Sequence, residues 1–83
     1  MVNPPISVIG TTTWGTTLAI INAKMGKNVS LIARTTQEAK QLVNAGENSR
    51  FLPGYKFPET LKITSQIDKA IFESKVVIVA VPS

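Results

Sequence analysis

The sequence predicts an α/β fold built on a parallel sheet, and three observations lead to this prediction. Short apolar runs rich in β-branched residues alternate along the chain with segments whose apolar residues recur at helical spacing. The run at residues 76–81 is apolar without interruption, as in strands that are covered on both faces. The run at residues 6–9 ends at a glycine that opens a helical segment, as at the start of a parallel crossover.

Four strands and three helices are expected in strict alternation. The strands are expected at residues 6–9, 28–33, 61–64 and 76–81, and the helices at residues 13–25, 36–45 and 66–73. Right-handed crossovers between parallel strands give the strand order 3-2-1-4. Ligands of such sheets bind beyond the carboxyl ends of the strands where the order reverses, which here places Gly10 beside Pro82.

The expected helix ends carry recognisable signals. Thr35 and Glu38 have the spacing of a capping box, in which each side chain accepts a hydrogen bond from a backbone amide at the other end of the motif. Ser65 begins a second signature of this kind, so we expect it to cap the third helix. Gly26 and Gly46 suit the left-handed position that follows a helix.

The first expected helix gathers its larger apolar residues on one face, which we expect to pack against the sheet. These residues are Trp14, Leu18, Ile21 and Met25. Ala19 and Ala23 are small enough to allow a close approach between helix and strand.

Composition limits the chemistry that this chain can perform. Its 83 residues form one domain at most, and 43% hydrophobic with 17% charged residues is typical of a folded protein. The absence of cysteine and histidine excludes disulfides, thiolate metal sites and a histidine base. We therefore expect no metal site, and the sequence indicates no catalytic residue.

The charge pattern bears on partners and location. The net charge is +4, but the basic residues are scattered without a dense run, which favours a phosphate ligand over a nucleic acid. The N-terminus lacks a basic segment followed by an apolar core, and no run reaches the roughly 20 apolar residues of a membrane span. We expect a cytoplasmic protein without a membrane partner.

The segment between the first strand and the first helix is the candidate phosphate site. Gly10 and Gly15 hold the first and third glycine positions of the pattern G-x-G-x-x-G, and Thr12 replaces the second. A threonine at that position would crowd a pyrophosphate. The hydroxyls of Thr11, Thr12 and Thr13 could instead donate to phosphate oxygens, or these residues could only cap the helix.

Arg34 is the second candidate for cofactor binding. It stands nineteen residues beyond Gly15, where NAD-specific sites carry an acidic residue that binds the ribose hydroxyls. A guanidinium suits a 2′-phosphate, which favours NADP over NAD, or acceptance of both. The alternative is a solvated surface arginine.

Together, these residues resemble the N-terminal part of NAD(P)-dependent glycerol-3-phosphate dehydrogenases. That family reads V-I-G-A-G-S-W-G-T-A-L-A from its first strand, and residues 8–19 here read V-I-G-T-T-T-W-G-T-T-L-A. The family's loop motif N-x-x-Y/F-L-P-G, with a further proline, is matched by residues 48–54 and Pro58. Its fourth strand ends A-V-P-S, as residues 80–83 do here. The matches keep the family's order over nearly the whole chain.

The resemblance implies a Rossmann-like fold and an enzyme that interconverts sn-glycerol 3-phosphate and dihydroxyacetone phosphate for phospholipid synthesis. It also implies that Thr13 and Trp14 contact the pyrophosphate region of NADP or NAD. Ala33 and Arg34 would lie by the adenosine ribose, and Phe51 would approach the cofactor from the loop. Alternatively, Trp14 simply packs, and the apolar residues of the loop only cover the sheet.

The chain departs from the family at Thr12 and in its extent. The family continues into more sheet, a catalytic lysine region and a helical substrate domain. Residues 1–83 therefore correspond to the N-terminal part of a cofactor-binding domain, which we expect to be inactive by itself. The fourth strand would then be an exposed apolar edge through which we expect self-association. The alternatives are another Rossmann dehydrogenase and a non-catalytic phosphate-binding or assembly module.

Overall fold

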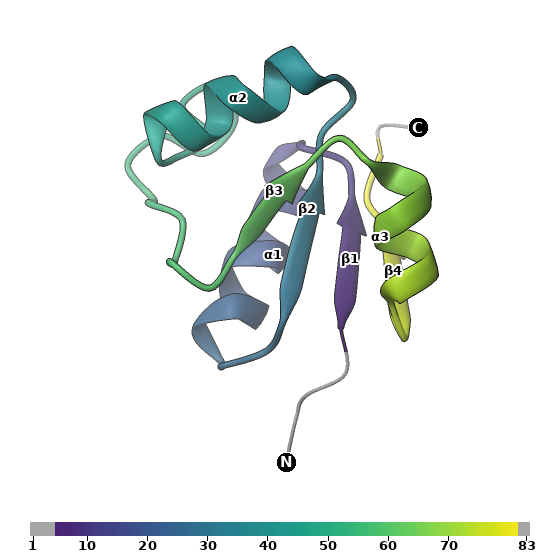
Figure 1. Cartoon of the computed structure of the whole chain (residues 1–83). Coiled ribbons are helices and arrows are strands. Elements are labelled where there is room, and N and C mark those ends of the chain that lie inside the picture. The colour runs from purple at the N-terminus through teal and green to yellow at the C-terminus, as the bar shows by residue number, and fades with distance from the viewer. Residues whose placement is uncertain (1–4, 82–83) are drawn as a thin grey trace.

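The computed structural model describes residues 5–81 and has the seven expected elements in the expected order (Figure 1). They are β1 (Ile6–Ile9), α1 (Thr13–Lys24), β2 (Val29–Ile32), α2 (Thr36–Ala45), β3 (Lys62–Thr64), α3 (Ile67–Glu73) and β4 (Val76–Val79). The largest difference in bounds is in the last strand, which ends at Val79 rather than at residue 81. None of the helices within residues 5–81 has the length and apolar character needed to span a membrane.

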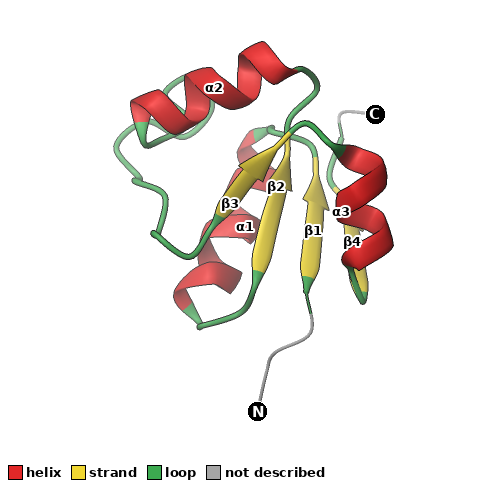
Figure 2. Ribbon diagram, viewed as in Figure 1, coloured by secondary structure: helices red, strands yellow, loops and turns green. Residues whose placement is uncertain are grey.

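The four strands form one parallel sheet in the order β3-β2-β1-β4, which confirms the predicted topology. β1 lies in the middle, and Ile6 is in register with Val29 of β2 and with Val76 of β4. α1 lies behind the sheet and α3 in front of it in Figure 2, while α2 lies next to β3. All four strands therefore end at the same edge, where β1 leads into α1.

The main core lies between the sheet and α1. Val8, Val29 and Leu31 are fully buried in the two neighbouring strands, and Ala19 is fully buried on the helix that covers them. Leu52 and Phe57 from the long loop pack against the edge of this cluster. The loop thus covers the sheet, as one of the two sequence interpretations proposed.

The face of α1 that packs on the sheet is not the one expected. Its buried residues are Gly15, Thr16, Ala19, Ile20 and Ala23. Trp14 is 65% exposed, Ile21 49% and Met25 64%, so the prediction that these three residues pack inward was wrong, while the close packing expected of Ala19 and Ala23 is confirmed. Gly15, Ala19 and Ala23 let the helix lie close to the strands, and Ile20 packs beside them in the core.

Thr35 caps α2 as predicted, but the reciprocal half of the capping box is absent among residues 5–81, because the Glu38 side chain accepts from the Arg34 amide and not from that of Thr35. The amide of Glu38 donates to the Thr35 hydroxyl at 3.0 Å, and Gly46 ends the helix with φ of 72°. The cap predicted for α3 was wrong. Gln66 is the N-cap of α3 and makes no side-chain capping bond, while the Ser65 hydroxyl instead hydrogen-bonds the Thr36 hydroxyl at 3.1 Å. Ser65 thus bonds the start of α2 and does not cap α3, which is the role that the local sequence predicts for it.

Candidate functional site

The turn that follows β1 depends on two glycines. Gly10 has φ of 118°, and a Cβ at this position would overlap the carbonyl group of Ala80. A Cβ on Gly15 would overlap the carbonyl oxygen of Gly10. These glycines therefore let the turn approach β4 and let α1 approach the turn, which are the roles expected for the first and third glycines of the pattern.

The three threonines of the turn use their hydroxyl protons within the protein. Thr11 donates to Glu38 Oε1 at 3.1 Å, Thr12 donates to the carbonyl oxygen of Ala80 at 2.9 Å, and Thr13 donates to that of Phe51 at 2.9 Å. The Thr12 hydroxyl also accepts from the Gly15 amide at 3.2 Å. Thr12 is thus the N-cap of α1, as the capping alternative predicted.

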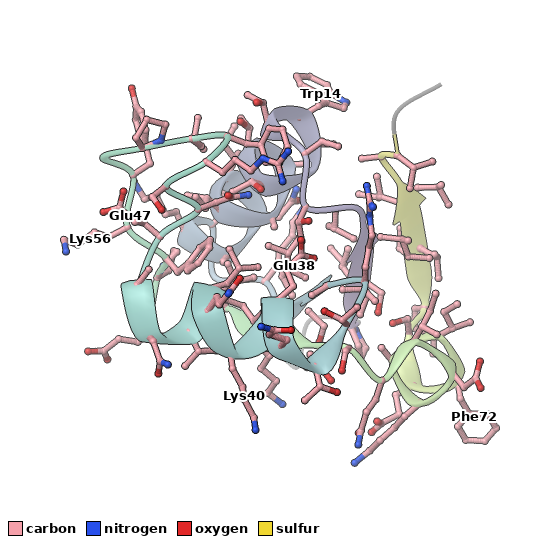
Figure 3. The ribbon with its side chains drawn as sticks, turned by 90° about the horizontal axis from the view of Figure 1, so that it is seen from above. Trp14, Glu38, Lys40, Glu47, Lys56 and Phe72 are labelled. Atoms are coloured by element: carbon pink, nitrogen blue, oxygen red, sulfur yellow. The ribbon has the colours of Figure 1, made fainter. Side chains whose placement is uncertain are left out.

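Backbone amides are the donors that remain at the start of α1. Among residues 5–81, no group accepts a hydrogen bond from the amide of Thr13 or of Trp14. The positive end of the helix dipole adds to these donors, and together they favour an anion. The Trp14 side chain projects away from the body of the molecule (Figure 3), so the alternative that it packs inside is wrong.

Arg34 and Glu38 lie together at the carboxyl end of β2. Ala33, which is buried, makes the last hydrogen bond between this end of β2 and β3: its amide donates to the Thr64 carbonyl at 2.8 Å. Arg34 is exposed, and its amide donates to Glu38 Oε1 at 3.0 Å. Because the same oxygen accepts from Thr11, Glu38 joins the end of β2 to the turn after β1. Sequence reasoning used Glu38 only as a capping residue.

Asn48 fixes the long loop to the turn. Its side chain is 3% exposed, and its Nδ2 donates to the Thr11 carbonyl at 2.7 Å and to the Thr16 hydroxyl at 2.9 Å. The sequence placed Asn48 in the loop motif without a role. The sequence signal that could have identified it is an asparagine placed three residues before the aromatic residue of the motif. If such an amide is buried, it needs hydrogen-bond partners and can hold two segments together.

The next residues of the loop bring an aromatic ring and a cation to the site. The Arg50 guanidinium lies over the Phe51 ring, 5.0 Å from its centroid, and Phe51 is 38% exposed. The bond from Thr13 to the Phe51 carbonyl holds this part of the loop against the start of α1.

These groups surround a hollow of about 350 Å³ at the carboxyl ends of β1 and β2. Five predicted site residues line it: Gly10, Thr12, Ala33, Arg34 and Phe51. Of the others, Thr13, Trp14 and Gly15 follow in the first turn of α1, and Pro82 lies outside the described residues. The lining also includes Glu38 and Arg50, so the hollow has two cations and one carboxylate.

Two other hollows, each of about 430 Å³, lie elsewhere. One lies between β2, β3 and α3 and is lined by Lys62, Lys69 and Glu73, and the other lies between α2 and β3. Neither is lined by residues of the glycine turn, whereas Gly10, Thr11 and Thr12 line the hollow described above. Size alone therefore does not identify the site, and the hollow at the glycine turn has the chemistry that suits a phosphate-bearing ligand.

Comparison with known proteins agrees with this geometry. The family model for the N-terminus of NAD-dependent glycerol-3-phosphate dehydrogenase matches residues 5–83. A glycerol-3-phosphate dehydrogenase (NAD(P)+) of Desulfotalea psychrophila is 42% identical over 80 residues, which are 96% of this chain and 24% of that protein. The namesake protein of Dehalococcoides mccartyi is 44% identical over 79 residues, which are 94% of this chain and 22% of that protein.

Solved structures give the same result. The crystal structure of glycerol-3-phosphate dehydrogenase from Coxiella burnetii superposes with a TM-score of 0.89 at 33% identity, over 98% of this chain and 25% of that one. The structure of DsGPDH of Dunaliella salina, at 18% identity and a TM-score of 0.84, shares the fold over 99% of this chain and 19% of that one. This chain spans about a quarter of the length of the first of these relatives (24%). It belongs to the family of NAD-dependent glycerol-3-phosphate dehydrogenases and corresponds to the N-terminal part of its members.

Proposed function

We propose that this chain binds NADP or NAD in the hollow at the glycine turn and forms the first part of the cofactor-binding domain of a glycerol-3-phosphate dehydrogenase. The observation that carries the proposal is the open first turn of α1, where the amides of Thr13 and Trp14 have no acceptor among residues 5–81 and follow the end of β1. A pyrophosphate at this position would accept from both amides and lie at the positive end of the helix dipole.

The other groups fit the remaining parts of a dinucleotide. The Arg34 guanidinium is exposed beside the end of β2, where it can pair with a 2′-phosphate. The ring of Phe51, with Arg50 above it, offers a flat surface that can stack on an adenine or nicotinamide ring. Scattered basic residues supply these contacts without the dense patch that a nucleic acid requires.

The proposed activity is the interconversion of sn-glycerol 3-phosphate and dihydroxyacetone phosphate, as in the enzymes that the relatives are named for. NADP or NAD, when bound, would supply the hydride chemistry. The residues of this chain would bind and orient the cofactor, and none of residues 5–81 is placed to move a proton to a substrate carbonyl. We therefore propose that the chain has no turnover by itself, and that the activity belongs to the cytoplasm and to phospholipid synthesis.

A titration of Trp14 tests the cofactor site. Trp14 is the only tryptophan of the chain, and it begins α1 next to the proposed pyrophosphate position. We expect NADPH and NADH to quench its fluorescence with saturation, and calorimetry to give the same dissociation constants. A linear signal without saturation, together with no heat of binding, would remove the proposal.

Two variants that each remove one positive charge distinguish a specific contact with the 2′-phosphate from a general effect of charge on cofactor affinity. Arg34→Gln removes the proposed partner of the 2′-phosphate, so we expect the affinity for NADPH to fall by about tenfold while that for NADH changes little, since charge-assisted contacts of this kind contribute ~1.5–3 kcal/mol. Lys62→Gln removes an exposed cation of β3 that does not line this hollow and should leave both affinities unchanged. Equal losses for NADPH in the two variants would show a general charge effect.

We also propose that the chain associates with itself through β4. This strand forms an edge of the sheet, and Val76, Val77 and Val79 are 44%, 39% and 64% exposed. An exposed apolar edge offers unpaired backbone groups and apolar side chains to a second strand. Phe72 of α3, which is 91% exposed, extends the apolar surface on the same side of the molecule (Figure 3).

A further inference from the structure

Glu38 brings a carboxylate to the site from an element that is not expected to supply one. It is the third residue of α2, it is half-buried, and it lines the hollow with Arg34 and Thr11. Figure 3 shows its side chain reaching from α2 toward the segment between β1 and α1. Its Oε1 accepts from the Arg34 amide at 3.0 Å and from the Thr11 hydroxyl at 3.1 Å.

These two bonds hold the carboxylate at the end of β2. In parallel-sheet sites that bind NAD, an acidic residue at this end accepts the hydroxyls of the adenosine ribose. Here Arg34 occupies that sequence position, and its amide is bonded to Glu38. Glu38, four residues after Arg34, therefore places a carboxylate at the end of β2, where the residue directly after the strand does not supply one.

The second carboxylate oxygen of Glu38, Oε2, has no hydrogen-bond donor within the described part of the chain, whereas Oε1 has two donors. An ionised carboxylate can accept about four hydrogen bonds, so it has room for the two hydroxyls of a ribose. A 2′-phosphate offers no hydroxyl at that position, and its negative charge would face the carboxylate.

We propose that Glu38 binds the adenosine ribose and favours NAD over NADP, in opposition to Arg34, which favours NADP. This inference rests on the proposed cofactor site. The acceptance of both cofactors would then follow from two neighbouring groups of opposite charge, each suited to one form of the ribose. Sequence reasoning from Arg34 alone favours NADP because it misses the carboxylate that α2 supplies.

The substitution Glu38→Gln tests this role with little change of shape. The glutamine keeps an oxygen that can accept from Arg34 and Thr11, and the backbone bond to Thr35 that caps α2 is unaffected. It removes the negative charge and replaces the second oxygen by an NH₂ donor. We expect the affinity for NADH to fall by about tenfold or more and that for NADPH to stay or rise, since one hydrogen bond to a charged group is lost. Calorimetry with both cofactors, and circular dichroism for the fold, measure these effects.

Glu59→Gln is the matched control, because Glu59 is an exposed loop residue that does not line the hollow. It changes the net charge equally and should leave both affinities unchanged. An unchanged ratio of NADPH to NADH affinity in Glu38→Gln, or equal losses for both, would overturn the role of Glu38 while the cofactor site stands. Binding of neither cofactor by the native chain would overturn the cofactor site and this inference with it.

A second measurement uses the native chain, so it does not require a variant to fold. The native chain is titrated with ADP-ribose and with its analogue that lacks the adenosine 2′-hydroxyl. We expect the analogue to bind about tenfold more weakly, because a hydroxyl that donates to a carboxylate is lost. Equal affinities would overturn the inference.

Discussion

Gly10 and Gly54 both have a left-handed φ, of 118° and 87°, but their surroundings differ. A Cβ on Gly10 meets the carbonyl group of Ala80, whereas a Cβ on Gly54 meets nothing within 4 Å. We expect Gly54→Ala to cost only the backbone strain of about 1 kcal/mol. Gly10→Ala adds a clash between β4 and the turn, so it should unfold at clearly lower denaturant concentration. Similar midpoints for the two variants would contradict this reading of Gly10.

Thr12 has two effects that are expected to oppose each other. Its hydroxyl caps α1 and donates to the Ala80 carbonyl, so Thr12→Gly should lower the free energy of unfolding by about 1 kcal/mol. A glycine also lets a pyrophosphate come closer to the backbone, so the affinity for NADPH should rise. Chemical denaturation and calorimetry measure the two effects separately. An unchanged affinity would show that Thr12 does not crowd the phosphate.

At the scale of elements, the long loop depends on one buried side chain. Asn48→Ala removes the donors to Thr11 and Thr16 and leaves their buried oxygens without those partners. We expect the free energy of unfolding to fall by about 2 kcal/mol. The affinity for cofactor should also fall, because the loop places Phe51 at the site. Denaturation and Trp14 fluorescence measure both effects.

Asn44→Ala is the control for that loop variant. Asn44 is an exposed residue near the end of α2, and alanine is at least as good a helix former. Its stability and cofactor affinity should equal those of the native chain. A loss as large as that of Asn48→Ala would mean that the buried contacts of Asn48 do not hold the loop.

Element types were predictable because they depend on local pattern. Thr35 caps α2 through the Glu38 amide as the spacing predicts, and Gly46 ends the helix as expected. Ser65 has an equally good local signal, but it bonds Thr36 of another helix instead of capping α3. The packing face of α1 was also not predictable from apolar spacing. The sheet packs against the face that carries Ala19, Ile20 and Ala23, because the two alanines let helix and strand approach closely while Ile20 fills the core beside them.

At the scale of the whole molecule, β4 is one of the two edges of the sheet within residues 5–81. If β4 associates with a second copy, the sedimentation coefficient should rise with concentration. Val79→Lys places a charge on this edge, where the side chain is 64% exposed, and should shift the protein to the monomer. Val43→Lys changes an equally apolar residue of α2 that is 59% exposed, and should leave association unchanged. Sedimentation of the native chain as a monomer at every concentration would refute the proposal.

The sequence by itself determined the order of the elements, the parallel sheet with the order 3-2-1-4, and the family. These depend on apolar runs, glycines and short motifs, which act over a few neighbouring residues. The positions of Gly10 and Gly15 at the candidate site were determined in the same way.

Only the tertiary structure decided how the side chains of the site are used. Thr11, Thr12 and Thr13 donate to Glu38, Ala80 and Phe51, which lie far from them in the sequence. Each such bond exists because the parallel strands end at one edge and bring separate segments together there. Local sequence shows a group that can donate or accept, but the fold decides which partner it meets.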